Sequence, residues 1–281
     1  MRPAAPLAEF TRVVQAALAE DLGDRGDVTT DAVVPAGTPM QAVIRSRENG
    51  RVAGGDAIAL VLAQFTEAAT ASIAAPDGTD VAAGGVVATL SGSARTLLTG
   101  ERVMLNLLGR LSGIATATAA AVRAVDGTGA AIKDTRKTTA GLRALEKYAV
   151  AVGGGVNHRF GLYDAVLIKD NHIGVAGSIA AAVDRVRAQR GKALPVQVEV
   201  DTLAQLEQAL DCAVESVLLD NMAPDLLRRA VEIAHGRCHL EASGGVTLGN
   251  VRAIAETGVD SISLGWLTHS ARSLDLGLDV A

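Results

Sequence analysis

From residue 128 onward the sequence repeats one pattern, in which a short apolar run is followed by a polar turn and a helical segment. The apolar runs are residues 130–133, 165–169, 195–200, 216–220, 238–245 and 260–265. Strands that alternate with helices at this spacing indicate βα units and a parallel sheet. Because the runs are apolar on consecutive residues, both faces of the sheet should be covered.

An incomplete α/β barrel fits this half of the chain better than an open doubly wound sheet. The first strand and helix are not joined by a GxGxxG turn, which a dinucleotide-binding sheet would place there. Polar residues instead follow many of the predicted strands. In an α/β barrel, the active site lies at the carboxyl ends of the strands, so these residues should converge.

The first part of the chain has a different character. Residues 8–22 have the apolar spacing of an amphipathic helix. Residues 39–110 mix strand signals, such as MQAVIRSR and GGVVATLSG, with helical stretches, and a long helix is expected over 100–124. The sequence therefore predicts two structural halves.

Charge and composition exclude some functions. The formal net charge is -5, which argues against general binding to nucleic acid or to a membrane surface. The N-terminus lacks the apolar core of a signal peptide, and no uncharged run is long enough to span a bilayer. Cys212 and Cys238 have no metal-site spacing and are expected to be reduced, as in the cytoplasm.

The polar residues at the predicted strand ends form an ordered series. They are Lys133, Asp134, Arg136 and Lys137, then Lys169 and Asp170, Glu199 and Asp201, Asp220 and Asn221, Glu241 and Ser243, and finally Gly265. Cations follow the early strands, carboxylates follow the middle strands, and small residues follow the last two. Such a set suits a sugar phosphate together with a second polyanion.

Each feature taken alone also has a purely structural explanation. The turn at 243–245 could be only a turn, Glu199 and Asp220 could be solvated loop carboxylates, and His158 could merely pack. Arg143 and Lys147, one helical turn apart, are expected on a solvated face. The argument for a site is that so many chemical groups fall at one edge of the sheet.

Five motifs carry a specific resemblance. They are DTRKT (134–138), GGGVNHR (153–159), LIKDNH (167–172), LLDN (218–221) and SGG (243–245). In this order they resemble the quinolinate phosphoribosyltransferase family. The segments at 27–30, 100–116 and 267–279 fit the same family, so the resemblance covers nearly the whole chain.

The resemblance implies a two-domain α/β fold. An N-terminal α/β sandwich domain, residues 1–113, would be completed by 268–281 and packed on an incomplete parallel α/β barrel at 114–267. The reaction implied is that quinolinate and phosphoribosyl pyrophosphate (PRPP) give nicotinate mononucleotide, pyrophosphate and CO2, with Mg²⁺ as cofactor. A cytoplasmic homodimer, or a larger assembly, that shares its active sites between subunits is expected.

The resemblance also assigns roles to residues of this sequence. Quinolinate carboxylates are assigned to Arg136, His158, Arg159 and Arg102, the last of these reaching the barrel of a partner subunit. The implied catalytic residues are Lys137, Lys169, Glu199 and Asp220, of which the two carboxylates hold the ribose hydroxyls and Mg²⁺, directly or through PRPP. The remaining substrate-binding positions are Thr135, Ser243, Gly244, Gly245, Leu264, Gly265 and Trp266.

Small departures and rival functions stay open at this point. Ala140, Ala242 and Trp266 differ from what is usual in the family, and Trp266 bears on the shape of the phosphate pocket. One rival is a related phosphoribosyltransferase-like protein associated with molybdate genes. Others are a class I aldolase that uses Lys169 as a Schiff base and a non-catalytic sugar-phosphate binder.

Overall fold

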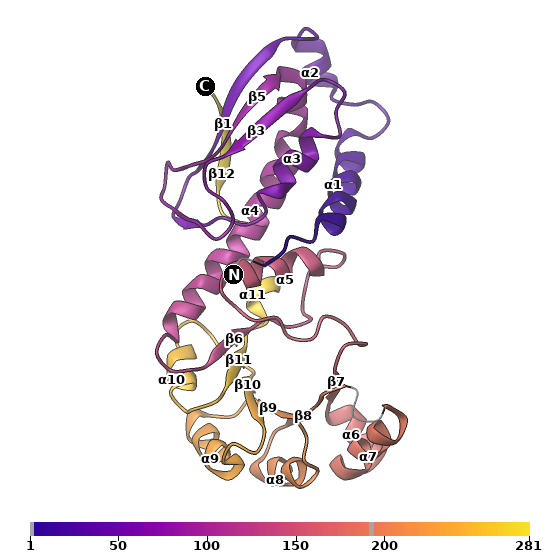
Figure 1. Cartoon of the computed structure of the whole chain (residues 1–281), viewed down its shortest axis with the longest axis vertical. Helices are drawn as coiled ribbons and strands as arrows, with labels where there is room; N and C mark the ends of the chain where they lie inside the picture. The colour runs from indigo at the N-terminus through magenta and orange to yellow at the C-terminus, as the bar shows by residue number, and fades with distance from the viewer. Residues whose placement is uncertain (1–2, 191–193) are drawn as a thin grey trace. The chain divides into compact units, whose positions relative to one another are not determined.

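The computed structural model describes residues 3–190 and 194–281, and the chain forms two compact units (Figure 1). The first unit comprises Met1–Ala119, Thr138–Gly154 and Leu267–Ala281, and the second comprises Ala120–Lys137 and Gly155–Trp266. The C-terminal segment thus belongs to the first unit. The expected domain boundary between residues 113 and 114 stays a prediction.

The first unit contains a four-stranded antiparallel sheet with the strand order β12-β1-β5-β3. Its strands are β1 (Pro39–Ser46), β3 (Ala69–Ile73), β5 (Val86–Ser93) and β12 (Leu276–Val280), and a separate pair is formed by β2 (Gly50–Arg51) and β4 (Asp80–Val81). Its helices are α1 (Leu7–Leu22), α2 (Val28–Val33), α3 (Asp56–Leu62) and α5 (Arg143–Val152). Two further helices, α4 (Ala94–Ala124) and α11 (Trp266–His269), contain residues of both units.

The second unit contains a six-stranded parallel sheet with the strand order β6-β11-β10-β9-β8-β7. The strands are β6 (Ala131–Lys133), β7 (Val166–Ile168), β8 (Val196–Val200), β9 (Ser216–Asp220), β10 (His239–Ser243) and β11 (Ser261–Ser263). The helices are α6 (Asp170–Ala176), α7 (Ile179–Arg190), α8 (Leu203–Asp211), α9 (Pro224–Ala234) and α10 (Val251–Ala255). Figure 1 shows these helices on the outer side of a curved row of strands.

All six strands predicted for the second half are present, which confirms the expected α/β class with a parallel sheet, and the structure adds a separate antiparallel sheet in the first unit. Beyond β6 the chain adds one isolated parallel bridge, between Lys133 and Val156. The Val156 N–H donates to the Ile132 carbonyl at 2.8 Å, and the Asp134 N–H donates to the Val156 carbonyl at 3.2 Å. This segment fixes the backbone of the residues that follow it, His158 and Arg159.

Two helices differ from the sequence predictions. The long helix begins at Ala94 rather than near residue 100. The solvated position expected for Lys147 is wrong, because its side chain is 1% exposed. Every residue from Leu145 to Val150 on α5 is buried, so the helix is enclosed on all sides.

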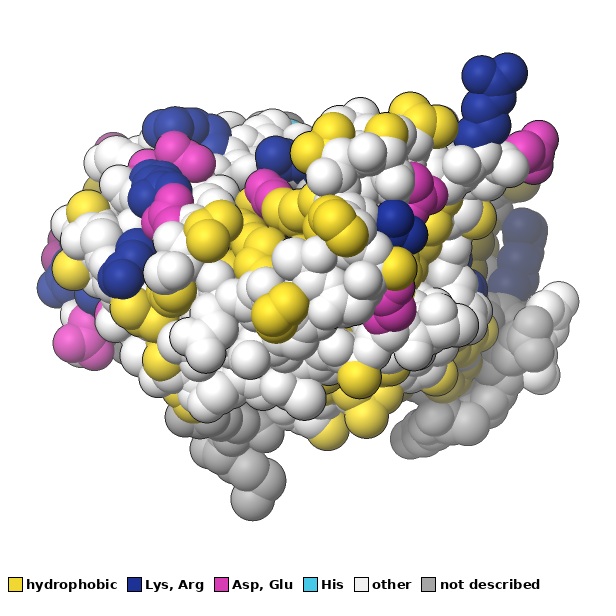
Figure 2. Space-filling model, turned by 90° about the horizontal axis from the view of Figure 1, so that it is seen from above, with side chains coloured by type: hydrophobic (Ala, Val, Ile, Leu, Met, Phe, Trp, Pro, Cys, Tyr) yellow, Lys and Arg dark blue, Asp and Glu magenta, His cyan; other side chains and the backbone are white. Residues whose placement is uncertain are grey.

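Within the described residues, α4 is the one helix long and apolar enough to cross a membrane by length and composition. The most apolar window of α4 is 72% buried, which is the pattern of a core helix. The first unit also exposes apolar side chains: Val28 and Val33 on α2 are 62% and 73% exposed. Figure 2, a view from the end at which α2 lies in Figure 1, shows hydrophobic side chains gathered among charged ones.

Candidate functional site

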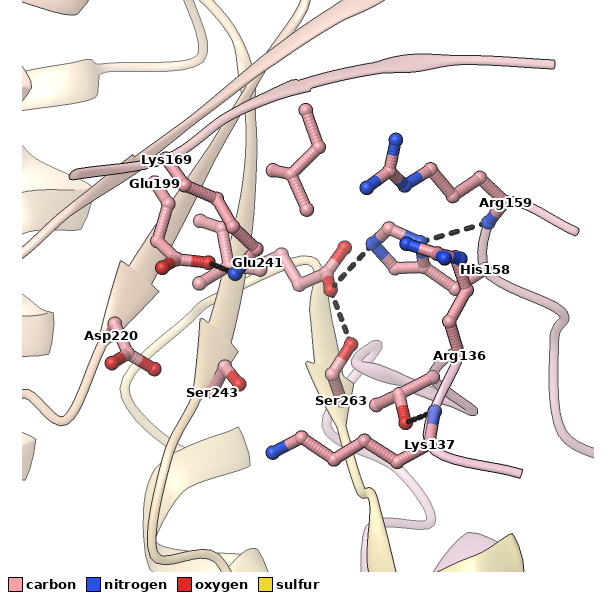
Figure 3. A pocket seen from close by; sticks show the side chains of 13 residues that line it. Arg136, Lys137, His158, Arg159, Lys169, Glu199, Asp220, Glu241, Ser243 and Ser263 are labelled. Carbon is pink, nitrogen blue, oxygen red and sulfur yellow. Dashed lines mark hydrogen bonds and ion pairs between the residues drawn. The ribbon is translucent and has the colours of Figure 1, made fainter. Parts of the chain in front are cut away.

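A cavity of about 400 Å³ opens at the carboxyl ends of the strands of the parallel sheet (Figure 3). Its lining residues are Thr135, Arg136, Lys137, His158, Arg159, Leu167, Lys169, Glu199, Leu218, Asp220, Glu241, Ser243 and Ser263. Four of these side chains are cations and three are carboxylates. The cavity thus gathers four cations in a protein that is acidic overall.

The loop after β6 presents the first two cations. Asp134 is fully buried, and its Oδ1 accepts the N–H of His158 at 2.8 Å. The Thr135 hydroxyl accepts the N–H of Lys137 at 3.0 Å, which fixes the turn between them. The buried Nε of Arg136 has no hydrogen-bond partner within the part of the chain that the structure describes.

Arg136 lies close enough to Arg159 for its positive charge to disfavour the charge of Arg159. Burial lowers the pKa of the Arg159 guanidinium, and the positive charge of Arg136 lowers it further. One Arg159 nitrogen, Nη1, donates to the Ala165 carbonyl at 3.2 Å. An anion placed between the two guanidiniums would relieve their repulsion.

Lys169 and Glu199 form an ion pair in the cavity, with Lys169 Nζ donating to Glu199 Oε2. Lys169 directly follows β7, and its N–H donates to His172 Nδ1 at 2.9 Å, which holds the start of α6. Because the Lys169 amine is engaged by a carboxylate, this arrangement speaks against the rival in which Lys169 is a Schiff-base nucleophile. Asp220, at the end of β9, accepts from the side-chain amide of Asn221 at 2.6 Å.

Glu241 lies on the floor of the cavity and is fully buried. Its carboxylate accepts from Lys133 Nζ at 2.9 Å, from Gln197 Nε2 at 3.1 Å and from the Ser263 hydroxyl. His158 Nε2 lies 3.2 Å from Glu241 Oε1 (Figure 3). Burial alone would raise the pKa of Glu241, but the hydrogen bond from His158, the Lys133 charge and the Ser263 hydroxyl outweigh it and hold that pKa far below its usual range.

The turn after β10 depends on glycine. Gly244 has φ +91, and a Cβ atom there would overlap the side-chain oxygen of Asn221. Gly245 has φ +60, so two successive residues adopt a conformation that other residues rarely take. Beside this turn, the Trp266 indole N–H donates to the Val246 carbonyl at 3.0 Å.

Most of the predicted site residues converge on the cavity. Those that line it are Thr135, Arg136, Lys137, His158, Arg159, Lys169, Glu199, Asp220 and Ser243. Gly244 and Gly245 follow the lining Ser243, while Leu264, Gly265 and Trp266 follow the lining Ser263. Arg102 lies on α4 in the first unit, with its side chain 63% exposed. The individual roles of these residues remain predictions.

Four lining residues were not among the predicted site residues: Leu167, Leu218, Glu241 and Ser263. The sequence placed Glu241 near a strand end, but it gave no sign that the carboxylate is fully buried and bound by Lys133 and Gln197. Leu167, Leu218 and Ser263 belong to strands, and nothing in their spacing distinguishes them from other core positions.

The carboxylates of the cavity suit Mg²⁺ if substrate phosphates supply further oxygen ligands. No group of three or more His, Cys, Asp and Glu side chains able to hold a metal occurs among the residues that the structure covers. Glu199 and Asp220 nevertheless supply two carboxylates to one cavity. Mg²⁺ is commonly bound by one or two carboxylates plus substrate phosphates and water, so these two residues fit it.

Comparison with known proteins covers nearly the whole chain. Residues 27–112 match the N-terminal domain of quinolinate phosphoribosyl transferase, and residues 114–279 match its C-terminal domain. A Mycobacterium leprae protein named nicotinate-nucleotide pyrophosphorylase [carboxylating] is 48% identical over 95% of this chain and 95% of its own length. A Bacillus subtilis protein with the same name, qualified as probable, is 44% identical over 93% of this chain and 90% of its own.

A solved structure agrees with these relatives. The nicotinate-nucleotide pyrophosphorylase of Francisella tularensis superposes with a TM-score of 0.94 at 38% identity, covering 99% of this chain and 98% of that one.

Proposed function

This chain belongs to the quinolinate phosphoribosyltransferase family, and on that premise we propose how its cavity binds the two substrates and assists the reaction. The enzyme is a pentosyltransferase of NAD biosynthesis. It transfers the phosphoribosyl group of PRPP to quinolinate with decarboxylation, giving nicotinate mononucleotide, pyrophosphate and CO2.

The observation that carries the assignment of the quinolinate site is the pair Arg136 and Arg159. Two guanidiniums that repel one another, one with a buried Nε that lacks an acceptor, are an arrangement suited to a dianion. The planar fork of arginine matches a carboxylate, and quinolinate offers one carboxylate to each. The pyridine ring would then lie between these residues and the carboxylates across the cavity.

Glu199 and Asp220 face the ribose in this proposal. As pyrophosphate leaves C1, positive charge develops on the sugar ring, and the two carboxylates stabilise that charge and hold the ring hydroxyls. The pyridine nitrogen bonds to C1 and becomes cationic, so the neighbouring ring carbon can retain the electron pair when CO2 leaves and then accept a proton. No protein nucleophile is required.

In this proposal Lys169 pairs first with Glu199 and then, once PRPP has bound, with the departing pyrophosphate. In the structure it is paired with Glu199, and the arrival of PRPP would exchange that carboxylate for the departing pyrophosphate. Glu199 and Asp220 are the residues that would hold Mg²⁺, directly or through PRPP, and Mg²⁺ when bound supplies charge that neutralises the leaving group.

The turn at Ser243–Gly245 is the proposed position of the 5′-phosphate. Its two glycines with positive φ leave backbone N–H groups unobstructed by side chains, a geometry that suits anions. Ser263 and the residues after it, Leu264 to Trp266, form the other side of this phosphate site. The indole N–H of Trp266 donates to the Val246 carbonyl, so the ring stabilises the turn and does not bind the phosphate itself.

The assembly and compartment are further parts of the proposal. We infer a homodimer in which Arg102 of one subunit completes the cavity of the other. The exposed arginine side chain and the apolar side chains on the surface of the first unit (Figure 2) support an assembly. The two free cysteines support a reducing compartment such as the cytoplasm.

The direct test is to incubate the purified protein with quinolinate, PRPP and Mg²⁺ and to quantify nicotinate mononucleotide. Parallel reactions without Mg²⁺, and with nicotinate in place of quinolinate, test the cofactor and the need for two carboxylates. Release of CO2 in a one-to-one ratio with the nucleotide is expected. Absence of product from folded protein would refute the assignment.

A further inference from the structure

We propose that Glu241 and Lys133 are positioning residues for quinolinate binding. Glu241 holds the His158 ring in one orientation, with Nε2 as the donor, and Lys133 balances the charge of Glu241 so that a buried carboxylate can lie beneath a site for anions. This inference rests on the proposed function of the cavity, and it assigns to His158 a supporting role instead of a direct contact with a substrate carboxylate.

The hydrogen bonds of His158 determine where its ring proton lies. The backbone N–H of Arg159 donates to His158 Nδ1 at 2.8 Å. Because a backbone N–H can only donate, Nδ1 is the acceptor in this contact, and Nε2 is the ring nitrogen that can donate. Nε2 lies 3.1 Å from Gln197 Oε1 and 3.2 Å from Glu241 Oε1, which are both acceptors.

Both ring nitrogens of His158 therefore have partners within the protein. The ring connects Glu241, on the floor of the cavity, to the backbone of Arg159. On one side Glu241 fixes the ring, and on the other the ring fixes the backbone N–H of Arg159. Asp134 adds a second constraint by accepting the N–H of His158 itself at 2.8 Å. Arg159, whose guanidinium lines the cavity, is thus anchored at its own backbone.

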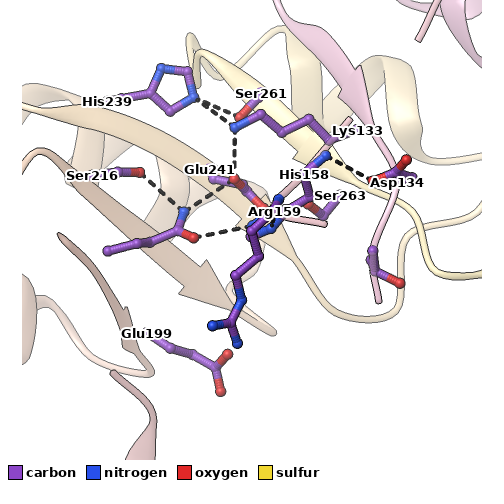
Figure 4. A network of polar contacts seen from close by, with 12 residues as sticks. Lys133, Asp134, His158, Arg159, Glu199, Ser216, His239, Glu241, Ser261 and Ser263 are labelled. Carbon is purple, nitrogen blue, oxygen red and sulfur yellow. Dashed lines mark hydrogen bonds and ion pairs between the residues drawn. The ribbon is translucent and has the colours of Figure 1, made fainter. Parts of the chain in front are cut away.

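A buried carboxylate beneath a dianion site would weaken binding unless its charge were balanced. Lys133 Nζ lies 2.9 Å from Glu241 Oε2 and is on the side of Glu241 opposite Arg159 and Glu199 (Figure 4). Lys133 is absent from the lining of the substrate cavity, although it lines a neighbouring cavity of about 320 Å³. Its charge can therefore act on quinolinate only through Glu241 and through space.

The test is a double-mutant cycle on Lys133→Met and Glu241→Gln, read as the KM of each substrate and as kcat. Lys133→Met leaves Glu241 without its cation, and we expect the quinolinate KM to rise about tenfold, with a smaller change in the PRPP KM. The double variant removes both charges, and the glutamine keeps a side-chain oxygen that can accept from His158 Nε2, so its quinolinate KM should return to within about threefold of the wild type. Arg228→Met, which removes an exposed arginine of α9, is the control for loss of one positive charge.

The outcomes are separable from those of the proposed function, which the wild-type reaction tests. An unchanged quinolinate KM in Lys133→Met, or a double variant no better than that single variant, would overturn the inference while the wild type stays active. If Lys133→Met does not fold, Lys133→Gln makes the same comparison.

A second measurement needs no turnover. Histidine ¹⁵N spectra, with His158 assigned from its loss in His158→Asn, should show a protonated Nε2 and an unprotonated Nδ1. An imidazolium or an Nδ1–H tautomer would contradict the proposal.

Discussion

Replacing Arg136 by methionine is expected to weaken quinolinate binding and, at the same time, to make the free protein slightly more stable. The two effects have one cause. The buried Nε of Arg136 has no acceptor among the described residues, and its charge disfavours the charge of Arg159. The arginine pair is therefore costly without substrate and favourable with it, as is common for groups arranged for binding.

The magnitudes follow from the surroundings of the two arginines. Removing one partner of a largely desolvated carboxylate–guanidinium pair costs about 3 kcal/mol, which is about a 150-fold rise in the quinolinate Kd. The repulsion relieved in the free protein is on the order of 1 kcal/mol at most, because both guanidiniums are partly solvated and salt screens them. A gain of that size corresponds to about 2 °C in Tm for a chain of this length.

Isothermal titration calorimetry with quinolinate and differential scanning calorimetry of the free protein measure the two quantities. Arg228→Met is the matched control, because Arg228 is an exposed arginine on α9 paired with Asp225. The control should leave quinolinate affinity unchanged and should not raise Tm. Native quinolinate affinity in Arg136→Met, or a Tm below that of the control, would refute the reasoning.

Four further predictions concern the rest of the site. Nicotinate should be a poor substrate, because a site for two carboxylates leaves buried charge unpaired when one is missing, and a comparable kcat/KM for the two acids would argue otherwise. Glu199→Ala and Asp220→Ala should lower kcat far more than they weaken quinolinate binding, and calorimetry that shows mainly lost quinolinate affinity would reverse their assigned role. Trp266→Ala should raise the PRPP KM with kcat nearly unchanged, since its indole supports the phosphate turn; a large fall in kcat at saturating PRPP would count against this. Mixed dimers of Arg102→Ala and Lys169→Ala, reassociated at random, should recover roughly a quarter of wild-type activity, because one site in each mixed dimer is intact, whereas inactive mixed dimers would exclude a shared site.

Much of the parallel sheet could be predicted because its signals are local. A strand covered on both faces must be apolar on consecutive residues, and a polar residue after it marks the end of the strand. For that reason the run at 216–220 coincides with β9, and the carboxylate of Asp220 could be placed at the edge that carries the site. The turn at 243–245 could also be predicted, since paired glycines permit a positive φ.

The one residue whose environment was misjudged, Lys147, is buried by parts of the chain that are distant in the sequence. Lys147 looked like a solvated lysine, yet α5 is enclosed on all sides and its side chain is 1% exposed. Burial of a helix depends on what packs around it, and a helical pattern rich in alanine does not state that.

By itself, the sequence determined the alternation of strands and helices, the order in which cations, carboxylates and glycines follow the strands, and the family to which the chain is similar. Only the tertiary structure decided which of these groups face one another. Glu241 is separated by 108 positions from Lys133 and by 44 from Gln197, yet all three meet beneath the cavity. The state of a titratable group depends on burial and on partners within a few ångströms, and those distances exist only after the parallel sheet has brought the strand ends together.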